Sequence, residues 1–209
     1  MTVTVAVRES VPVRGHLALT VVRDHELAPG DLQRYADLTV RHGLTPAAAL
    51  EQILGVPDPV REHRAGDNIM CTAGWSALAA AMVWSGVQDQ AANLGLTSST
   101  FLTPLYGAVG NGSGTPVKSD TQLYAELSRQ TVGAGASSPA TASIPAESTW
   151  LFYYPSPLTA WTVTEAALFA NATSTVNSGS MVDHWAFSPT VAVSTTNSLI
   201  LEISLSWGP

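Results

Sequence analysis

The chain has 209 residues and a formal net charge of −7, and 45% of its residues are apolar while only 12% are charged. This length fits one large domain, or a small module beside a standard domain, and the apolar share is enough for a hydrophobic core. The nine Lys and Arg residues are scattered, which excludes direct binding of nucleic acid or of an anionic membrane. The single cysteine, Cys71, excludes an internal disulfide and a cysteine-based zinc site.

The distribution of charge divides the chain near Gly66. Of the nine basic residues, only Lys118 and Arg129 lie beyond residue 65, where Ser, Thr and Gly are abundant instead. We therefore expect an N-terminal strand and helix region at residues 1–65 and a β-sandwich domain at residues 66–209. The N-terminus has no basic segment leading into an apolar run, so we predict no signal peptide, and no stretch is apolar enough for membrane insertion.

The first region begins with two alternating patterns of apolar and polar residues, at residues 3–7 and 17–21, and a period of two is typical of half-buried strands. Pro46 at a first helical position and Gly55 beyond a last one mark the ends of a helix. An earlier helix stops at Gly43, and prolines with a charged run follow the second helix. The predicted elements are two helices and a linker, at residues 31–42, 46–54 and 57–64.

The second region is dominated by strand patterns. Its apolar start predicts a buried helix at residues 75–84, and Asp120 is placed to cap a short helix that ends at Ser128. Pro and Gly, Asn or Ser clusters separate the runs that follow, as in a sandwich. The predicted strands cover residues 149–154, 161–169, 182–187 and 199–207. The expected fold class is mainly β, an antiparallel β-sandwich with a short helix-containing N-terminal region.

Candidate catalytic residues are few. Asp183, His184 and Ser188 are the residue types of a hydrolase triad, but neighbouring strand residues point to opposite faces, so Asp183 would not orient His184. Glu165 and Asp183 would suffice for glycoside hydrolysis if they shared a cleft. The histidines lack the spacing of metal ligands. We therefore expect a protein that is not an enzyme and needs no cofactor or metal, with a glycan-acting hydrolase as an alternative.

The sequence predicts one specific contact, which involves Glu165. On the strand at residues 161–169 the odd-numbered residues share a face, so Glu165 lies among apolar neighbours. A lone buried carboxylate is unfavourable, and an arginine can meet it with two parallel hydrogen bonds. Arg129 closes the helix predicted before it. We therefore predict a structural ion pair between Arg129 and Glu165. The alternative is a strand twist or bulge that turns Glu165 to solvent.

Five segments of the second region form a series. They are Asp67–Met70 continued by Thr72–Gly74, Leu105–Pro116, Ser119–Arg129, Trp161–Phe169 and Met181–Pro189. In this order they resemble the motifs of a family of phage tail-fibre-like proteins, including its glycine-rich loop and its Ser-Asp-Thr segment. Two positions depart from the family pattern, because Ala167 replaces a usual glycine and His184 replaces a common arginine.

The resemblance implies a structural component of a bacteriophage virion, in a tail fibre or tail tip. A capsid-associated decoration or head-fibre protein is the alternative. Such a protein is assembled in the host cytoplasm with other virion structural proteins, and a host cell surface is a further candidate partner. We expect residues 1–65 to dock the chain onto the particle and the β-domain to fold without them. Six tryptophans exceed what one core of this size usually hides, so we also predict a symmetric homo-oligomer or a tight contact with another virion protein.

Overall fold

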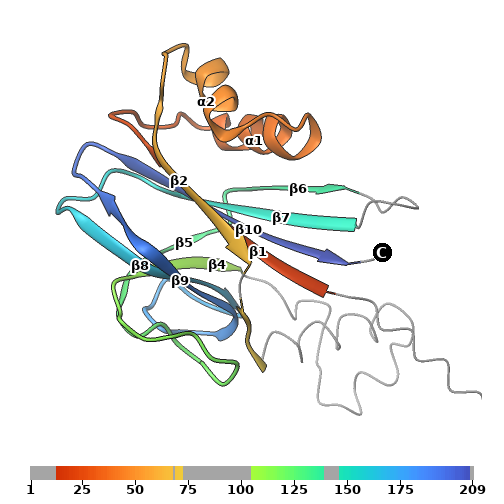
Figure 1. Cartoon of the computed structure of the whole chain (residues 1–209), viewed down its shortest axis with the longest axis vertical. Helices are drawn as coiled ribbons and strands as arrows, with labels where there is room; N and C mark the ends of the chain where they lie inside the picture. The colour runs from red at the N-terminus through yellow and green to blue at the C-terminus, as the bar shows by residue number, and fades with distance from the viewer. Residues whose placement is uncertain (1–12, 68, 73–104, 139–145, 208–209) are drawn as a thin grey trace, which may run out of the picture.

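Strands with alternating apolar residues build two five-stranded sheets in this computed structural model, which describes residues 13–67, 69–72, 105–138 and 146–207 (Figure 1). The pairings between their strands are antiparallel, and the sheets pack face to face, which confirms the predicted β-sandwich. Sheet A has the order β2 (Val60–Asp67), β1 (Val13–Val22), β10 (Ser198–Trp207), β7 (Ala146–Tyr154) and β6 (Ala134–Ser138). Sheet B has the order β3 (Ile69–Met70), β9 (Ser180–Val193), β8 (Trp161–Ala170), β4 (Tyr106–Gly110) and β5 (Glu126–Thr131).

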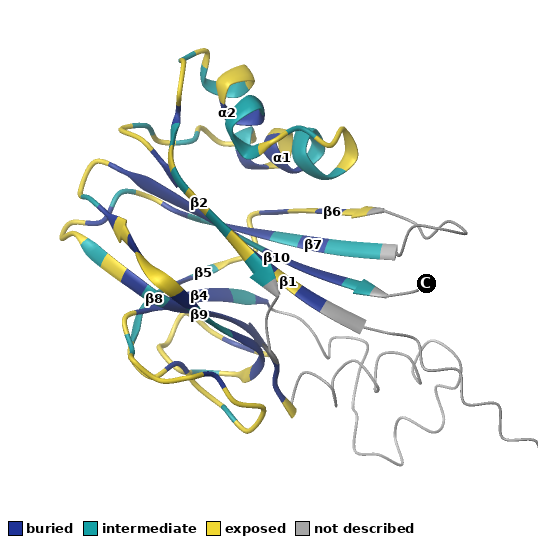
Figure 2. Cartoon of the chain, viewed as in Figure 1, coloured by how far each residue is buried: buried dark blue, intermediate teal, exposed yellow. Residues whose placement is uncertain are grey.

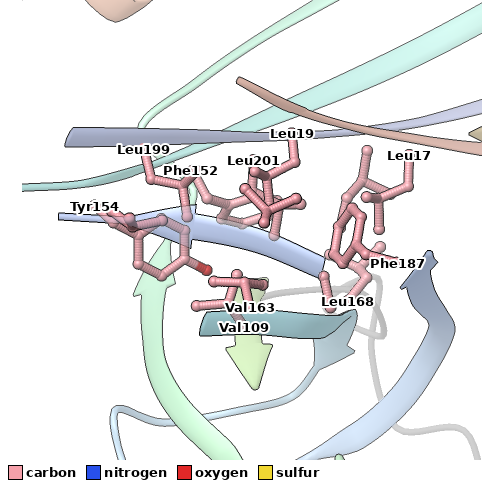
Figure 3. Close-up of a cluster of buried hydrophobic side chains, with 14 of the residues drawn as sticks. Leu17, Leu19, Val109, Phe152, Tyr154, Val163, Leu168, Phe187, Leu199 and Leu201 are labelled. Carbon is pink, nitrogen blue, oxygen red and sulfur yellow. The ribbon is translucent and has the colours of Figure 1, made fainter. Parts of the chain in front are cut away.

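The main core lies between the two sheets (Figure 3). Leu19 of β1 pairs with Leu201 of β10, and paired residues share a face, so alternate residues of both strands point inward together. Sheet A contributes the fully buried side chains Leu17, Leu19, Val21, Leu199, Leu201 and Ile203, and sheet B contributes Val109, Val163 and Leu168. The period of two that predicted strands at residues 17–21 and 199–207 is therefore the pattern that fills this core.

A small helical layer covers the outer face of sheet A (Figures 1 and 2). It consists of α1 (Asp31–Ala36), the π-helical turn η1 (Asp37–Arg41) and α2 (Pro46–Leu54). The Thr45 hydroxyl caps α2 by accepting from the Ala48 amide at 3.3 Å, and Gly55 ends it in the left-handed region. Both helices were predicted, and Tyr35 and Leu50 bury their side chains against this face of the sheet.

The predicted division at residue 66 is wrong, because the N-terminal region supplies two strands of sheet A. β2 runs through the predicted linker and across the boundary, and β1 lies between β2 and β10. Residues 1–65 are therefore not a separate folding unit. The pattern of β2 was misread because Arg61, Glu62 and Arg64 are charged, as is common for strands that lie at the end of a sheet.

The helix predicted over residues 120–128 is also wrong. Residues 111–125, called the 111–125 loop below, connect β4 to β5, which begins at Glu126. The Val117 amide donates to Asp120 Oδ2 at 2.8 Å, so Asp120 closes the turn before it instead of capping a helix after it. The strand expected at residues 3–7 and the helix expected at 75–84 lie outside the described residues. No helix in the described part of the chain is long and apolar enough to cross a membrane.

Candidate functional site

Four of the segments that carry the resemblance meet on the outer face of sheet B, where the 111–125 loop covers it. They are Leu105–Pro116, Ser119–Arg129, Trp161–Phe169 and Met181–Pro189. Gly110 of β4 pairs with Glu165 of β8, and Ala167 of β8 pairs with Ala108 on one side and His184 of β9 on the other. The small residues of β4 and β8 leave space above the sheet for the loop. Polar side chains that an open sheet would expose to water are therefore enclosed here.

Glu165 ties both ends of the 111–125 loop to the sheet. Its Oε1 accepts from the Gly112 amide at 3.0 Å and from the Ala125 amide at 2.8 Å, and its Oε2 accepts from the Tyr124 amide at 3.1 Å. The residue is only 1% exposed. One buried carboxylate therefore satisfies three backbone donors that the loop cannot pair within itself.

His184 joins Glu165 to a second carboxylate. Its Nδ1 lies 2.7 Å from Asp120 Oδ2, and its Nε2 lies 3.1 Å from Glu165 Oε2. An ionised carboxylate can only accept hydrogen bonds, so when Asp120 and Glu165 are both ionised, both ring nitrogens donate and the ring is protonated. Asp120, Glu165 and His184 are called the carboxylate–histidine network below. Glu165 holds the two ends of the loop, and the hydrogen bond from His184 to Asp120 also holds its middle.

Hydrogen bonds outweigh burial in setting the pKa values of the three groups in this network. Burial alone would raise the pKa of Glu165 and lower that of His184. The hydrogen bond between the two groups opposes both effects, aided by the three backbone amides on Glu165 and by Asp120 on His184. The pKa of Glu165 is consequently below its usual value, and the pKa of His184 is above its own. The Val117 amide and His184 likewise overcome burial and lower the pKa of Asp120.

Gly112 is required by the close approach of the loop to the network. A Cβ at this position would lie 2.4 Å from the Tyr124 Cβ and 2.5 Å from Glu165 Oε1, and contacts this short do not occur in folded proteins. The glycine-rich part of the resemblance therefore has a packing reason. It lets the backbone reach the carboxylate.

The predicted ion pair between Arg129 and Glu165 is wrong, although both residues are buried as expected. The partner of Arg129 is Glu126, with Nε to Oε1 at 2.6 Å and Nη2 to Oε2 at 2.7 Å. Arg129 Nη1 donates to the Ser178 carbonyl oxygen at 3.0 Å, and the guanidinium lies 4.7 Å from the centre of the Phe169 ring. This second buried pair fastens β5 to the segment that follows β8.

Two features of strand pairing explain the error. β4 lies between β5 and β8, so Arg129 and Glu165 are about two strand spacings apart, roughly 10 Å. The β4–β5 pairing is irregular, so Arg129 pairs with Ala108 while Glu126 pairs with Gly110. Ala108 and Gly110 are two residues apart and share a face of the sheet. Glu126 and Arg129 therefore also share a face, although residues three apart in a regular strand would not. A second irregularity, beyond Val163, turns Glu165 to the outer face. The loop, instead of solvent, covers it there.

Glu165 and Asp183 do not share a cleft. Asp183 pairs with Leu168, whose side chain lies in the core between the sheets, while Glu165 lies on the outer face beneath the loop. His184 turns its ring to Asp120 and Glu165, away from its chain neighbour Asp183, as expected of successive strand residues. Among the described residues, no group of three His, Cys, Asp or Glu side chains could hold a metal ion.

The carboxylate–histidine network is built to hold a loop. His184 is fully buried, and both oxygens of Glu165 accept hydrogen bonds from the protein itself.

Comparisons with models of protein families, with curated proteins and with solved structures found no match for this chain. Its function is therefore inferred from its residues and their contacts.

The Arg129–Glu126 pair gives a first prediction. Arg129→Ala and Glu126→Ala are each expected to lower the free energy of unfolding by about 3–5 kcal/mol, because each leaves a buried charge without its partner. The double variant should lose less than the sum of the two. Arg129→Ala and Glu165→Ala, which share no hydrogen-bond partner, should add within about 0.5 kcal/mol. Urea unfolding measures all of these, and additive losses at Arg129 and Glu126 would contradict the pair.

The pH dependence of stability gives a second prediction. Burial raises the pKa of Asp183 to about 7, and burial together with the charge of Glu147 raises that of Glu202 to about 7. The ordinary values are 3.8 and 4.5, so between these values and about 7 the folded chain holds more protons than the unfolded chain. Stability is therefore expected to fall as pH rises from 5 to 7, by up to about 1.4 kcal/mol per pH unit for each group.

The carboxylate–histidine network affects the dependence of stability on pH at both low and high pH. The stabilisation from His184 is complete below its ordinary pKa of 6.5 and is lost as pH rises through its raised one, which adds to the fall in stability above pH 6.5. The stabilisation from Asp120 and Glu165 is present above their ordinary values and is lost as pH falls through the lowered ones. Urea unfolding from pH 3 to 8 tests this, and stability that rises from pH 5 to 8 would contradict it.

Proposed function

We propose that this chain is a structural component of a bacteriophage virion, in a tail fibre or tail tip. One observation carries the proposal. The segments Leu105–Pro116, Ser119–Arg129, Trp161–Phe169 and Met181–Pro189, which resemble the phage tail-fibre-like family, converge on one buried structural arrangement. This convergence supports the proposal, because it gives the residues of the resemblance a shared structural role.

The roles of these residues favour a scaffold over a catalyst. Glu165, Asp120 and His184 hold the 111–125 loop, and Glu126 with Arg129 fastens the segment after β8. The loop then presents side chains on the surface, where Tyr124 is 43% exposed and Val117 is 48% exposed. A long loop fixed at both ends and its middle is suited to contact with a neighbouring protein.

Two other functions stay open as alternatives. A capsid-associated decoration or head-fibre protein would use the same scaffold at another place in the particle. A glycan-acting hydrolase has less support, because Glu165 and Asp183 lie on different faces of sheet B. The particle location separates the first two functions, and activity on glycans would identify the third.

We also propose that the chain acts as a homo-oligomer in contact with other virion structural proteins. Trp150, Trp161 and Trp185 pack partly buried against the main core, so they do not by themselves form an interface. The stronger support is the exposure of large apolar side chains, of which Leu158 is fully exposed and Val176 is 54% exposed. Sedimentation equilibrium should give a multiple of the monomer mass, and a stable monomer at all concentrations would contradict this.

Localisation in particles tests the proposed function. Purified virions of the phage whose genome encodes this chain are labelled with gold-conjugated antibody raised against the recombinant protein, and antibody absorbed with that protein is the control. Label at the tail fibre or tail tip is expected. Label on the head would replace the tail assignment with the capsid-associated alternative. Intact virions that carry no label and no peptides of the chain by mass spectrometry would overturn the proposal.

A further inference from the structure

The sequence has one Asn-Gly pair, Asn111-Gly112, and it lies where the 111–125 loop leaves β4. Asn-Gly pairs are prone to spontaneous deamidation, because glycine has no side chain to shield the backbone nitrogen that attacks the asparagine side chain. Asn111 is exposed, so water reaches its side-chain amide. A reactive pair is therefore placed at one of the two loop ends that Glu165 anchors.

Deamidation begins at the Gly112 amide. The nitrogen gives up its proton and attacks Cγ of Asn111, a carbon–nitrogen bond forms, and the side-chain NH₂ group leaves with a proton as ammonia. The product is a succinimide ring. Water then opens this ring at either of its carbonyl groups, which leaves aspartate or isoaspartate at position 111. The reaction therefore needs a Gly112 nitrogen that can lose its proton and turn towards the side chain.

The docked loop opposes both requirements. The Gly112 amide donates to Glu165 Oε1 at 3.0 Å, and loss of its proton would place an anion beside a buried carboxylate. The backbone is also held on both sides of this nitrogen. The Asn111 amide donates to the Ala125 carbonyl oxygen at 2.9 Å. The Thr164 hydroxyl donates to the Gly112 carbonyl oxygen at 2.5 Å. The attacking nitrogen is therefore restrained while the loop stays on sheet B.

We propose that Asn111 is a site of spontaneous deamidation that Glu165 suppresses, and that the modification starts only when this end of the loop leaves the sheet. The isoaspartate product inserts an extra carbon atom into the main chain before Gly112. The space around Gly112 is already full, because a Cβ there would lie 2.4 Å from the Tyr124 Cβ and 2.5 Å from Glu165 Oε1. The isoaspartate form therefore cannot dock as before, and release of the loop becomes irreversible. This chemistry does not depend on the proposed function.

Liquid chromatography with peptide mass spectrometry follows the conversion of Asn111 in the full chain at pH 7. The rate in the folded chain is compared with the rate in the chain unfolded by urea. Folding should lower this rate by about ten-fold or more, the effect of a hydrogen bond to a charged group. Equal rates in the two samples would overturn the proposal. This comparison needs no variant, so it does not depend on the folding of an altered chain.

Two variants test the role of Glu165. Glu165→Ala should raise the rate at Asn111 by about ten-fold or more, because the Gly112 amide loses its charged acceptor. Glu165→Gln keeps the size and one acceptor oxygen, so it should fold and give a smaller rise. Asn177, an exposed asparagine followed by Ser178 in the loop between β8 and β9, is measured in the same samples. Its rate reports general unfolding and should not rise with that of Asn111.

Leu19→Ala is the matched control. It removes a fully buried core side chain from β1 in sheet A and lowers the stability of the whole chain, but it leaves the contact between Gly112 and Glu165 in place. The rate at Asn111 relative to Asn177 should stay unchanged in this variant. An equal rise of this ratio in Leu19→Ala and in both Glu165 variants would overturn the proposal, since global stability would then protect Asn111. An unchanged ratio in both Glu165 variants would overturn it as well.

Discussion

A chain that lacks residues 1–65 is expected not to fold. The deletion removes β1 and nearly all of β2, and it leaves one edge of β10 without its partner along the whole strand. Leu17, Leu19 and Val21 of β1 are fully buried. Burial of such side chains contributes about 1.5–3 kcal/mol each, so their loss alone removes about 5–9 kcal/mol. This is comparable with the whole stability of a typical domain, about 5–15 kcal/mol.

Near-ultraviolet circular dichroism and urea unfolding of residues 66–209 measure this effect. The full chain should unfold in one cooperative transition, and the truncated chain should show none. A complementation experiment distinguishes a missing strand from a general loss of solubility. Mixing residues 1–67 with residues 68–209 should restore the tertiary signal, because β1 and β2 can then pair again. Cooperative unfolding of the truncated chain by itself would show that the N-terminal strands are dispensable.

Glu165→Ala is expected to lower the free energy of unfolding by about 3–5 kcal/mol, the cost of removing one partner from a buried charged pair. The change leaves three backbone amides without their acceptor, at Gly112, Tyr124 and Ala125. It also leaves the His184 ring with only one of its two carboxylate partners. Glu165→Gln keeps the size and one acceptor oxygen, so its loss should be smaller.

Glu62→Ala is the matched control for this measurement. Glu62 accepts from Arg64 Nε at 2.8 Å, but this pair is partly exposed, with 41% of the Arg64 side chain accessible. An exposed pair of this kind contributes less than about 1 kcal/mol. Urea unfolding at pH 7 should therefore separate the two alanine variants clearly. If Glu165→Ala costs no more than Glu62→Ala, the buried carboxylate does not hold the loop.

Local patterns with one physical meaning were read correctly from the sequence. The alternation from Leu199 to Leu205 has a single explanation, a strand with one face in a core, and the structure has this strand. Thr45, Pro46 and Gly55 mark the ends of α2 because each satisfies a backbone requirement that arises only at a helix end. Glu165 is buried as predicted, but for another reason, because the irregularity beyond Val163 turns it to the outer face and the 111–125 loop covers it there.

The sequence did not give the partners of the buried charges. The partner of Glu165 is set by the order of strands in sheet B, which places β4 between it and Arg129, and no local pattern encodes that order. The irregular pairing at Val109 and Gly110 likewise puts Glu126 beside Arg129, in a stretch for which a helix capped by Asp120 had been predicted. The Ser-Asp-Thr segment around Asp120 was a usable signal for the 111–125 loop, since Asp often closes a turn.

Amide hydrogen exchange of the 111–125 loop tests the central claim, that a buried carboxylate fixes this loop to sheet B. In the unchanged chain the amides of Gly112, Tyr124 and Ala125 are expected to be protected, because each donates to Glu165. In Glu165→Ala under native conditions their protection should fall strongly, while that of the Leu201 amide, in the middle of β10, should fall only with the global stability. Loop amides that exchange equally fast in both chains would contradict the claim.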